Sequence, residues 1–149
     1  MNCEEKEKLK KRLRMYYDYK NSISVILNRK KILDEQLKQI DEEIEATKYM
    51  RNTDKEFKLL KEEREMLFRK SLKCNRKVRE MQRFIKTMDD NIQGLTEECL
   101  TYLDLKFNKG KSNVAITLEM NLSETSRFNM EAKALESIYY YDCLQKGTI

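Results

Sequence analysis

Apolar residues recur at steps of three and four along two long stretches of the sequence, and this rhythm constrains the fold more than any other feature. Such a stripe keeps one face of a long α-helix apolar, and an isolated helix cannot bury that face. The chain has no Pro and only 3 Gly, so its composition offers little that would interrupt long helices. The sequence therefore predicts an all-α protein built around two long amphipathic helices.

The first stripe predicts a helix of roughly 45 residues that stops near 49–54, where the periodicity is lost. Lys20 and Lys30 interrupt its apolar face, and Ile26 offers an alternative to Leu27 in the middle. The stripe comprises Leu9, Leu13, Tyr16, Lys20, Ile23, Leu27, Lys30, Leu33, Leu37, Ile40 and Ile44.

The second stripe is more regular, and Thr53 or Asp54 can cap the helix that carries it. Two such helices with a short connection most simply form an antiparallel hairpin. Either stripe can also pair with a second chain, so a homo-oligomer through residues 9–88 is the alternative. The second stripe comprises Phe57, Leu60, Arg64, Leu67, Ser71, Cys74, Val78, Met81, Ile85 and Met88, of which Arg64, Ser71 and Cys74 weaken the middle.

The rhythm ends at Asp89-Asp90-Asn91, and Gly94 follows as a point where the chain can turn. We therefore predict two domains: a basic helical hairpin or coiled coil over residues 1–90, and a smaller domain over residues 91–149. Gly94 is the candidate hinge between them.

The smaller domain is expected to hold three shorter helices, with Thr96, Ser112 and Ser123 as their N-caps. The first runs to about Phe107 and is stopped by a left-handed residue at Gly110. The second ends near 120, and the third near 145.

A short helix, a three-residue turn and a longer capped helix have the spacing of a helix-turn-helix. Leu122 lies in the turn, where such motifs need an apolar residue between the two helices. The predicted core contains Leu103, Phe107, Val114, Ile116, Leu118, Met120 and Leu122, packed against Phe128, Leu135 and Ile138.

The stretch Leu105–Ile138, LKFNKGKSNVAITLEMNLSETSRFNMEAKALESI, resembles the region-4 helix-turn-helix of bacterial sigma factors. Its end, SETSRFNMEAKALESIYY, is similar to the ArpU/RinA-type phage transcriptional regulators, which pair a sigma-like C-terminal unit with a helical N-terminal region. The sequence departs from the family pattern at Arg127, where an apolar residue is common. With Phe128 beside it, the facing of the third helix is ambiguous by one position.

The resemblance implies that the start of the third helix enters the major groove of DNA, where Arg or Asn can read G or A through paired hydrogen bonds. An ordinary solvated helix face is the alternative interpretation. The expected DNA-binding residues are Lys111, Ser123, Thr125, Ser126, Arg127, Asn129 and Lys133.

Charge is distributed unevenly along the chain. Residues 95–149 hold six Lys/Arg and eight Asp/Glu, a net charge of −2, whereas residues 1–94 hold 25 and 18, a net of +7. Since DNA binding depends on contacts between cations and phosphates, the basic segments Lys6–Arg14 and Lys73–Lys86 are candidate phosphate-contacting surfaces. They are equally consistent with solvated helix faces or with a surface for an acidic protein partner.

Several classes of protein are disfavoured by composition. The chain has no His, which excludes a His base or a Ser-His-Asp triad, and its Gly residues are too far apart for a phosphate-binding loop. The four Cys include no CxxC pair, and no stretch approaches 18 apolar residues. We therefore expect a cytoplasmic protein that is not an enzyme, with no metal, no cofactor and no membrane span.

The resulting hypothesis is a sequence-specific transcriptional regulator of phage or prophage type. Its expected partners are double-stranded DNA, RNA polymerase and a second copy of the chain. The alternatives are a coiled-coil adaptor or inhibitor that binds another protein, and a small terminase-like DNA-packaging subunit.

Overall fold

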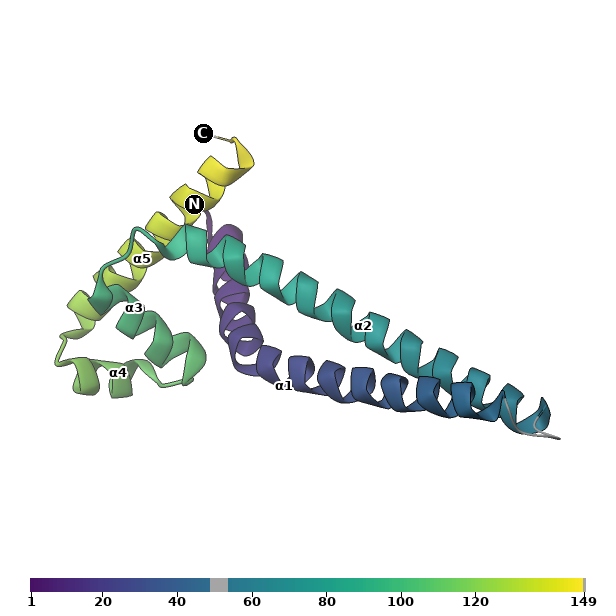
Figure 1. The fold of residues 1–149 in the computed structure, drawn as a ribbon. Coiled ribbons are helices and arrows are strands. Elements are labelled where there is room, and N and C mark those ends of the chain that lie inside the picture. Colours follow the sequence, from purple (N-terminus) through teal and green to yellow (C-terminus); the bar gives the residue numbers. More distant parts are fainter. Residues whose placement is uncertain (49–53, 149) are drawn as a thin grey trace. The chain divides into compact units, whose positions relative to one another are not determined.

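The computed structural model describes residues 1–48 and 54–148, and the regular structure within them is helical (Figure 1). The all-α class is confirmed: two long helices form a hairpin, and shorter helices follow. The predicted cap at Thr53 lies outside the described residues. The elements are α1 (Cys3–Thr47), α2 (Asp54–Ile92), α3 (Glu97–Leu103), the π-helix η1 (Asp104–Asn108), α4 (Asn113–Met120) and α5 (Glu124–Lys146).

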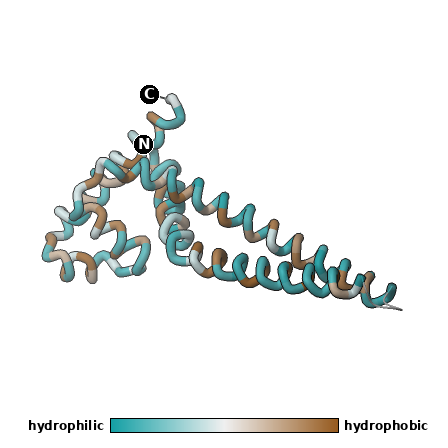
Figure 2. The backbone as a smooth tube through the Cα atoms, viewed as in Figure 1, coloured by the Kyte–Doolittle hydropathy of each residue, from teal (hydrophilic) through white to brown (hydrophobic). Residues whose placement is uncertain are grey.

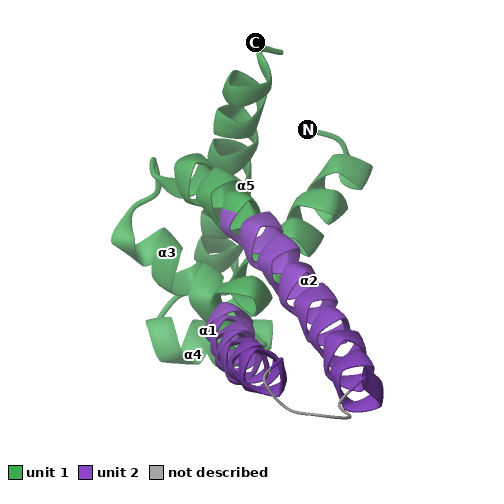
Figure 3. Ribbon diagram, turned by 45° about the vertical axis from the view of Figure 1, so that its right-hand side comes forward, with its two compact units in different colours: residues 1–21, 83–149 green, residues 22–82 purple. Residues whose placement is uncertain are grey.

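The chain forms two compact units, which Figure 3 colours separately. One unit comprises residues 22–82. The other comprises residues 1–21 together with residues 83–149. This division differs from the predicted boundary at residues 90/91, because the first turns of α1 and the last turns of α2 belong to the same unit as the C-terminal helices.

In the unit of residues 22–82, α1 and α2 pack along the two predicted stripes. Leu33 and Ile40 of α1 are buried, as are Val78 and Met81 of α2. Figure 2 shows the apolar residues recurring between polar ones along both helices. In the middle of the first stripe, Ile26 is partly buried whereas Leu27 is exposed, so the alternative phasing through Ile26 is the one adopted.

The polar residues in the second stripe find partners on α1. Ser71 is buried and its hydroxyl donates to the Asp34 carboxylate at 2.7 Å. One heptad away, the Arg64 guanidinium donates to Asp41 at 2.5 Å. Between these two pairs α1 advances by seven residues while α2 retreats by seven, which is the register of an antiparallel hairpin formed within one chain.

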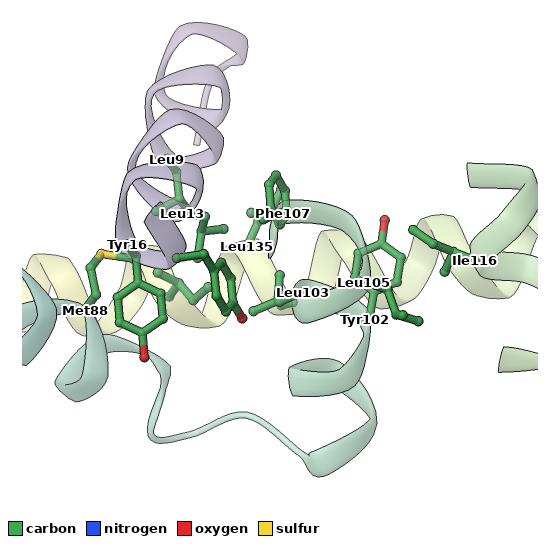
Figure 4. Packing of buried hydrophobic residues seen from close by; sticks show 13 residues of the cluster. Leu9, Leu13, Tyr16, Met88, Tyr102, Leu103, Leu105, Phe107, Ile116 and Leu135 are labelled. Carbon is green, nitrogen blue, oxygen red and sulfur yellow. The ribbon is translucent and has the colours of Figure 1, made fainter. Parts of the chain in front are cut away.

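The core of the other unit draws on both ends of the sequence. Leu9, Leu13 and Tyr16 of α1 and Met88 of α2 belong to the same buried cluster as the side chains of α3, η1, α4 and α5 (Figure 4). This shared core is the physical reason why residues 1–21 do not separate from the C-terminal helices. The C-terminal members of the cluster are Tyr102, Leu103, Leu105, Phe107, Ile116, Ala134, Leu135 and Ile138.

The three predicted N-caps are confirmed. The hydroxyl oxygens of Thr96, Ser112 and Ser123 accept hydrogen bonds from the backbone N–H groups three residues later. Each satisfies a donor that the first turn of its helix leaves unpaired. Gly110 adopts φ +64 after η1, which confirms the predicted left-handed stop.

Candidate nucleic-acid interface

The turn between α4 and α5 is set by three consecutive residues. Asn121 ends α4 in the left-handed region (φ 53, ψ 49), which Asn tolerates better than most residues. The backbone N–H of Leu122 donates to the Thr117 carbonyl at 2.9 Å, and the side chain of Leu122 is partly buried. Ser123 is extended and caps α5, with its Oγ accepting from the N–H of Ser126 at 3.1 Å. The second helix of the pair therefore begins immediately after the turn.

Arg127 faces the interior of its unit, contrary to the expectation that it would be an exposed base-reading residue. Its side chain is buried, with 4% exposed, whereas Phe128 is 59% exposed. The ambiguity of one position in the facing of α5 is thus resolved with Arg127 inside and Phe128 outside. The physical reason is that Arg127 occupies the usual apolar position but has charged partners there.

The Arg127 guanidinium is surrounded by acceptors on α5 and α3. It donates to Glu124 at 2.6 Å, to Glu131 at 3.1 Å and to the Tyr102 hydroxyl at 3.1 Å. The two carboxylates lie at i−3 and i+4 from Arg127, the helical spacing at which side chains meet. The hydrogen bond to Glu124 is the main cause that raises the pKa of Arg127, so the buried guanidinium keeps its positive charge.

Glu131 is the acceptor at the centre of this cluster. Besides Arg127 it receives the Lys106 ammonium at 2.7 Å, and the Lys10 ammonium of α1 lies 3.7 Å away. Burial alone would raise the pKa of the Glu131 carboxyl, but the hydrogen bond and charge of Lys106 and the charge of Lys10 outweigh it and lower the pKa. The carboxylate therefore stays ionised inside the unit.

A second buried carboxylate, Asp142, lies three turns further along α5. The Arg12 guanidinium of α1 lies 3.3 Å from it, the Lys146 ammonium 2.8 Å, and the Asn91 amide donates to it at 3.2 Å. Burial opposes ionisation, but the hydrogen bond from Lys146 and the charge of Arg12 lower its pKa below the usual value. Two acidic residues of the C-terminal half are therefore buried, and each is neutralised by cations of the C-terminal helices together with one cation of α1.

The net charge of the unit that holds the C-terminal helices is close to zero. Residues 1–21 and 83–149 together contain 15 Lys/Arg and 14 Asp/Glu, a net charge of +1. The net −2 of residues 95–149 is thus offset within the unit by the start of α1. Of the basic segment Lys6–Arg14, Lys11 and Arg14 are exposed, while Lys10 and Arg12 are engaged with the buried carboxylates.

The other predicted site residues lie on the surface near the start of α5. Thr125, Ser126, Asn129 and Lys133 are exposed. Ser123 is exposed too, but its oxygen is engaged as the helix cap and its hydroxyl donates to the Ser126 oxygen at 2.9 Å. Thr125, Ser126, Asn129 and Lys133 belong to α5, which Ser123 caps, and Arg127 is the member of the predicted set that the structure removes from the exposed face.

Lys111 precedes α4 and is exposed, in an ion pair with Glu119 at 3.1 Å. Lys111 precedes α4 and Glu119 lies within it, and both side chains are exposed. A surface pair of this kind is weak and can exchange for a phosphate.

Three members of the predicted core are on the surface instead. Val114 and Leu118 of α4 are 70% and 78% exposed, and Phe128 of α5 is 59% exposed. Val114 and Leu118 are one helical turn apart, so they form a short apolar strip on the outer face of α4. The predicted core residues Leu103, Phe107, Ile116, Leu135 and Ile138 are buried, and Met120 and Leu122 are partly buried.

Tyr102 and Glu131 also belong to this site, although neither was predicted from the sequence. Tyr102 is fully buried, and burial, the largest cause, with the charge of Glu131, raises the pKa of its hydroxyl to about 12. The spacing of Glu124 and Glu131 around Arg127 was a signal that this arginine could be satisfied within its own helix.

No known protein family, curated protein or solved structure matches the chain. Within residues 1–48 and 54–148, no helix is long and apolar enough to cross a membrane. The same residues contain no group of three or more Cys, Asp and Glu side chains placed to hold a metal ion.

Proposed function

We propose that this protein is a sequence-specific DNA-binding transcriptional regulator of phage or prophage type, which inserts the start of α5 into the major groove. The observation that carries the proposal is the inward orientation of Arg127 at the start of a capped helix. With Arg127 anchored to Glu131 and Tyr102, the residues Thr125 and Asn129 face outward directly after the α4–α5 turn. Recognition helices of helix-turn-helix proteins contact base edges with their first residues.

The exposed residues have suitable chemistry for that role. The amide of Asn129 can donate to one adenine atom and accept from another in the major groove, and the Thr125 hydroxyl can do either. Lys133, one turn further on, carries a charge that suits a phosphate. The N-terminus of α4, capped by Ser112, has backbone N–H groups that attract an anion.

The charge distribution supports modest phosphate contact. The exposed cations near α4 and α5 are few, and Lys111 already pairs with Glu119. Each phosphate contact contributes a slope of about −0.9 to the dependence of log affinity on log salt. We therefore expect a shallow salt dependence, corresponding to a few phosphates per protein chain. The engagement of RNA polymerase or a second copy of the chain is part of the same proposal.

The test is a fluorescence-anisotropy titration of the full chain with random duplex DNA at two salt concentrations, followed by selection of preferred sequences. The variant Thr125→Ala/Asn129→Ala should lose at least tenfold in affinity for the selected duplex, since two base contacts are removed at about 1–3 kcal/mol each. The matched control is Gln145→Ala, an exposed position on the same helix. Equal affinity of both variants, or no salt-dependent binding by the full chain, would overturn the proposal.

The apolar strip of Val114 and Leu118 favours one second candidate, a coiled-coil adaptor that binds another protein. Two large apolar side chains one turn apart on a surface helix are typical of a protein contact. A chain that fails to bind duplex DNA even at low salt, while Leu118→Glu abolishes capture of a purified partner, would support this candidate instead.

A further inference from the structure

We infer that Phe128 is a specificity-determining residue that reads the 5-methyl group of a thymine in the major groove. The inference rests on the proposed function and deepens it, because it assigns one base and one position of the target. Nothing in the sequence pattern pointed to this role, since Phe128 was expected in the core.

The position of Phe128 on α5 supports this role. It is the fifth residue of the helix, one turn after the Ser123 cap, and its ring is 59% exposed. The helical repeat of 3.6 residues puts it about 60° from Thr125 around the helix, on the side away from Asn129 and at the edge of the exposed face, with Arg127 turned inward. These are the positions from which a recognition helix reaches base edges.

The fold of the unit does not account for the exposure of this ring. Phe128 lies outside the hydrophobic cluster that buries Leu135 and Ile138 on the same helix. A ring that is 59% exposed forgoes much of the free energy that burial of its apolar surface would supply. A thymine methyl group would recover part of that free energy when DNA is bound.

The chemistry of the groove selects thymine. Thymine presents a methyl group at C5 in the major groove, and a side chain without donors or acceptors can contact it by apolar packing. Cytosine at the same place offers an amino group that Phe128 cannot pair. Since Asn129 is suited to adenine, the target should contain a thymine and an adenine at neighbouring positions.

The experiment uses the full chain and the duplex selected from the random pool, with each thymine replaced in turn by deoxyuridine, which lacks only the methyl group. Removing one buried methyl group should weaken binding about fourfold at a single position. In Phe128→Ala that effect should disappear, and in Phe128→Leu part of it should remain. Because Phe128 is exposed, its substitution is expected to leave thermal unfolding unchanged, which is measured in parallel.

Tyr140→Ala is the matched control, because Tyr140 is a 50% exposed aromatic residue on the same helix, far from its N-terminus. It should keep the deoxyuridine effect. The inference is overturned if the full chain binds the selected duplex and no deoxyuridine position weakens binding, if Phe128→Ala keeps the effect, or if the selected duplex lacks thymine. Those outcomes leave DNA binding intact, whereas a lack of salt-dependent binding overturns both the proposed function and this inference.

Discussion

Arg127 donates to Glu131 at 3.1 Å along α5, and both side chains are buried. Contacts from other helices, made by the Tyr102 hydroxyl to Arg127 and by Lys106 and Lys10 to Glu131, hold this side of α5 against the interior of the unit. When this buried cluster holds the inner side of α5, the residues on the opposite side of the helix face the solvent. Buried side chains therefore determine which residues are exposed at the start of α5.

Replacing Arg127 by Ala should lower the free energy of unfolding by about 2–4 kcal/mol, because it leaves the buried Glu131 with one neutralising partner fewer. Urea denaturation of the full chain measures the change. Glu124→Ala is the control, since that carboxylate is exposed and should matter far less. A stability loss in Arg127→Ala no larger than in Glu124→Ala would show that the cluster does not hold α5 in place.

Acid should destabilise the unit through Glu131 and Asp142. Both pKa values are lowered in the folded state, from ordinary values of 4.5 and 3.8. A carboxyl group with a lowered folded pKa contributes stability above its unfolded pKa and loses it as the pH falls through the folded pKa. The free energy of unfolding should therefore hold from neutral pH to about pH 5 and decline below it.

The variant Glu131→Gln checks the assignment. It should be less stable than the parent at neutral pH and should show a weaker decline between about pH 5 and pH 3. Denaturation curves at a series of pH values measure both effects. If the free energy of unfolding of Glu131→Gln falls with decreasing pH as steeply as that of the parent, other carboxylates cause the acid sensitivity.

Alkaline pH should destabilise the same unit through its buried tyrosines. Burial raises the pKa of Tyr17 and of Tyr102 to about 12, and burial with the hydrogen bond to Asp89 raises the pKa of Tyr16. A raised pKa of a neutral acid gives stability that is present below the unfolded value of 10.0 and is lost as the pH rises through the folded values.

An ultraviolet titration of the tyrosinates should resolve these late-ionising groups from the exposed tyrosines. Tyr16→Phe should remove one of them and lose the 2.5 Å hydrogen bond to Asp89. If all eight tyrosines titrate together near the ordinary value without unfolding, the burial of these rings is contradicted.

Gly94 should not tolerate a side chain. A Cβ at this position would lie 2.5 Å from Cε2 of Tyr141, so the ring must move. Gly94→Ala is expected to cost about 1–3 kcal/mol of stability as an overpacking change. In a Tyr141→Ala background most of that cost should vanish.

Gly110→Ala is the control for Gly94→Ala, because no atom lies within 4 Å of its Cβ position and its cost comes from the backbone at φ +64. That cost should be the same with and without Tyr141. If Tyr141→Ala leaves the stability cost of both Gly→Ala variants unchanged, contact with Tyr141 is not what makes Gly94→Ala destabilising.

The partly buried hydrogen bond between Ser71 and Asp34 should couple the two helices of the hairpin. A double-mutant cycle with Ser71→Ala and Asp34→Ala is expected to give a coupling of about 0.5–1.5 kcal/mol. Because the pair lies within one chain, the coupling should not depend on protein concentration. A coupling that grows with concentration would instead indicate pairing between chains.

Much of the fold could be predicted because its signals are local. The two stripes specify their helices through a period shared by neighbouring turns, and the N-caps at Thr96, Ser112 and Ser123 act on N–H groups three residues away. The left-handed stop at Gly110 is equally local. None of these features requires information from a distant part of the chain.

The facing of α5 could not be predicted in the same way. Its polar and apolar residues alternate so evenly that Arg127 and Phe128 were equally plausible on the inner side. The choice depends on Tyr102, Lys106 and Lys10, which come from other helices and satisfy the charges that Arg127 and Glu131 bring inside. Desolvated charges are tolerated only when such partners are in place.

The sequence by itself thus determined the long helices and the N-caps of the shorter ones, since each follows from interactions within a few turns, whereas it left open whether the two apolar stripes pair within one chain or between chains. The tertiary structure alone decided that the start of α1 shares a core with α5, that Leu118 and Phe128 lie outside, and that Arg127 lies inside. The reason is that burial is a property of packing between distant segments, which no local pattern contains.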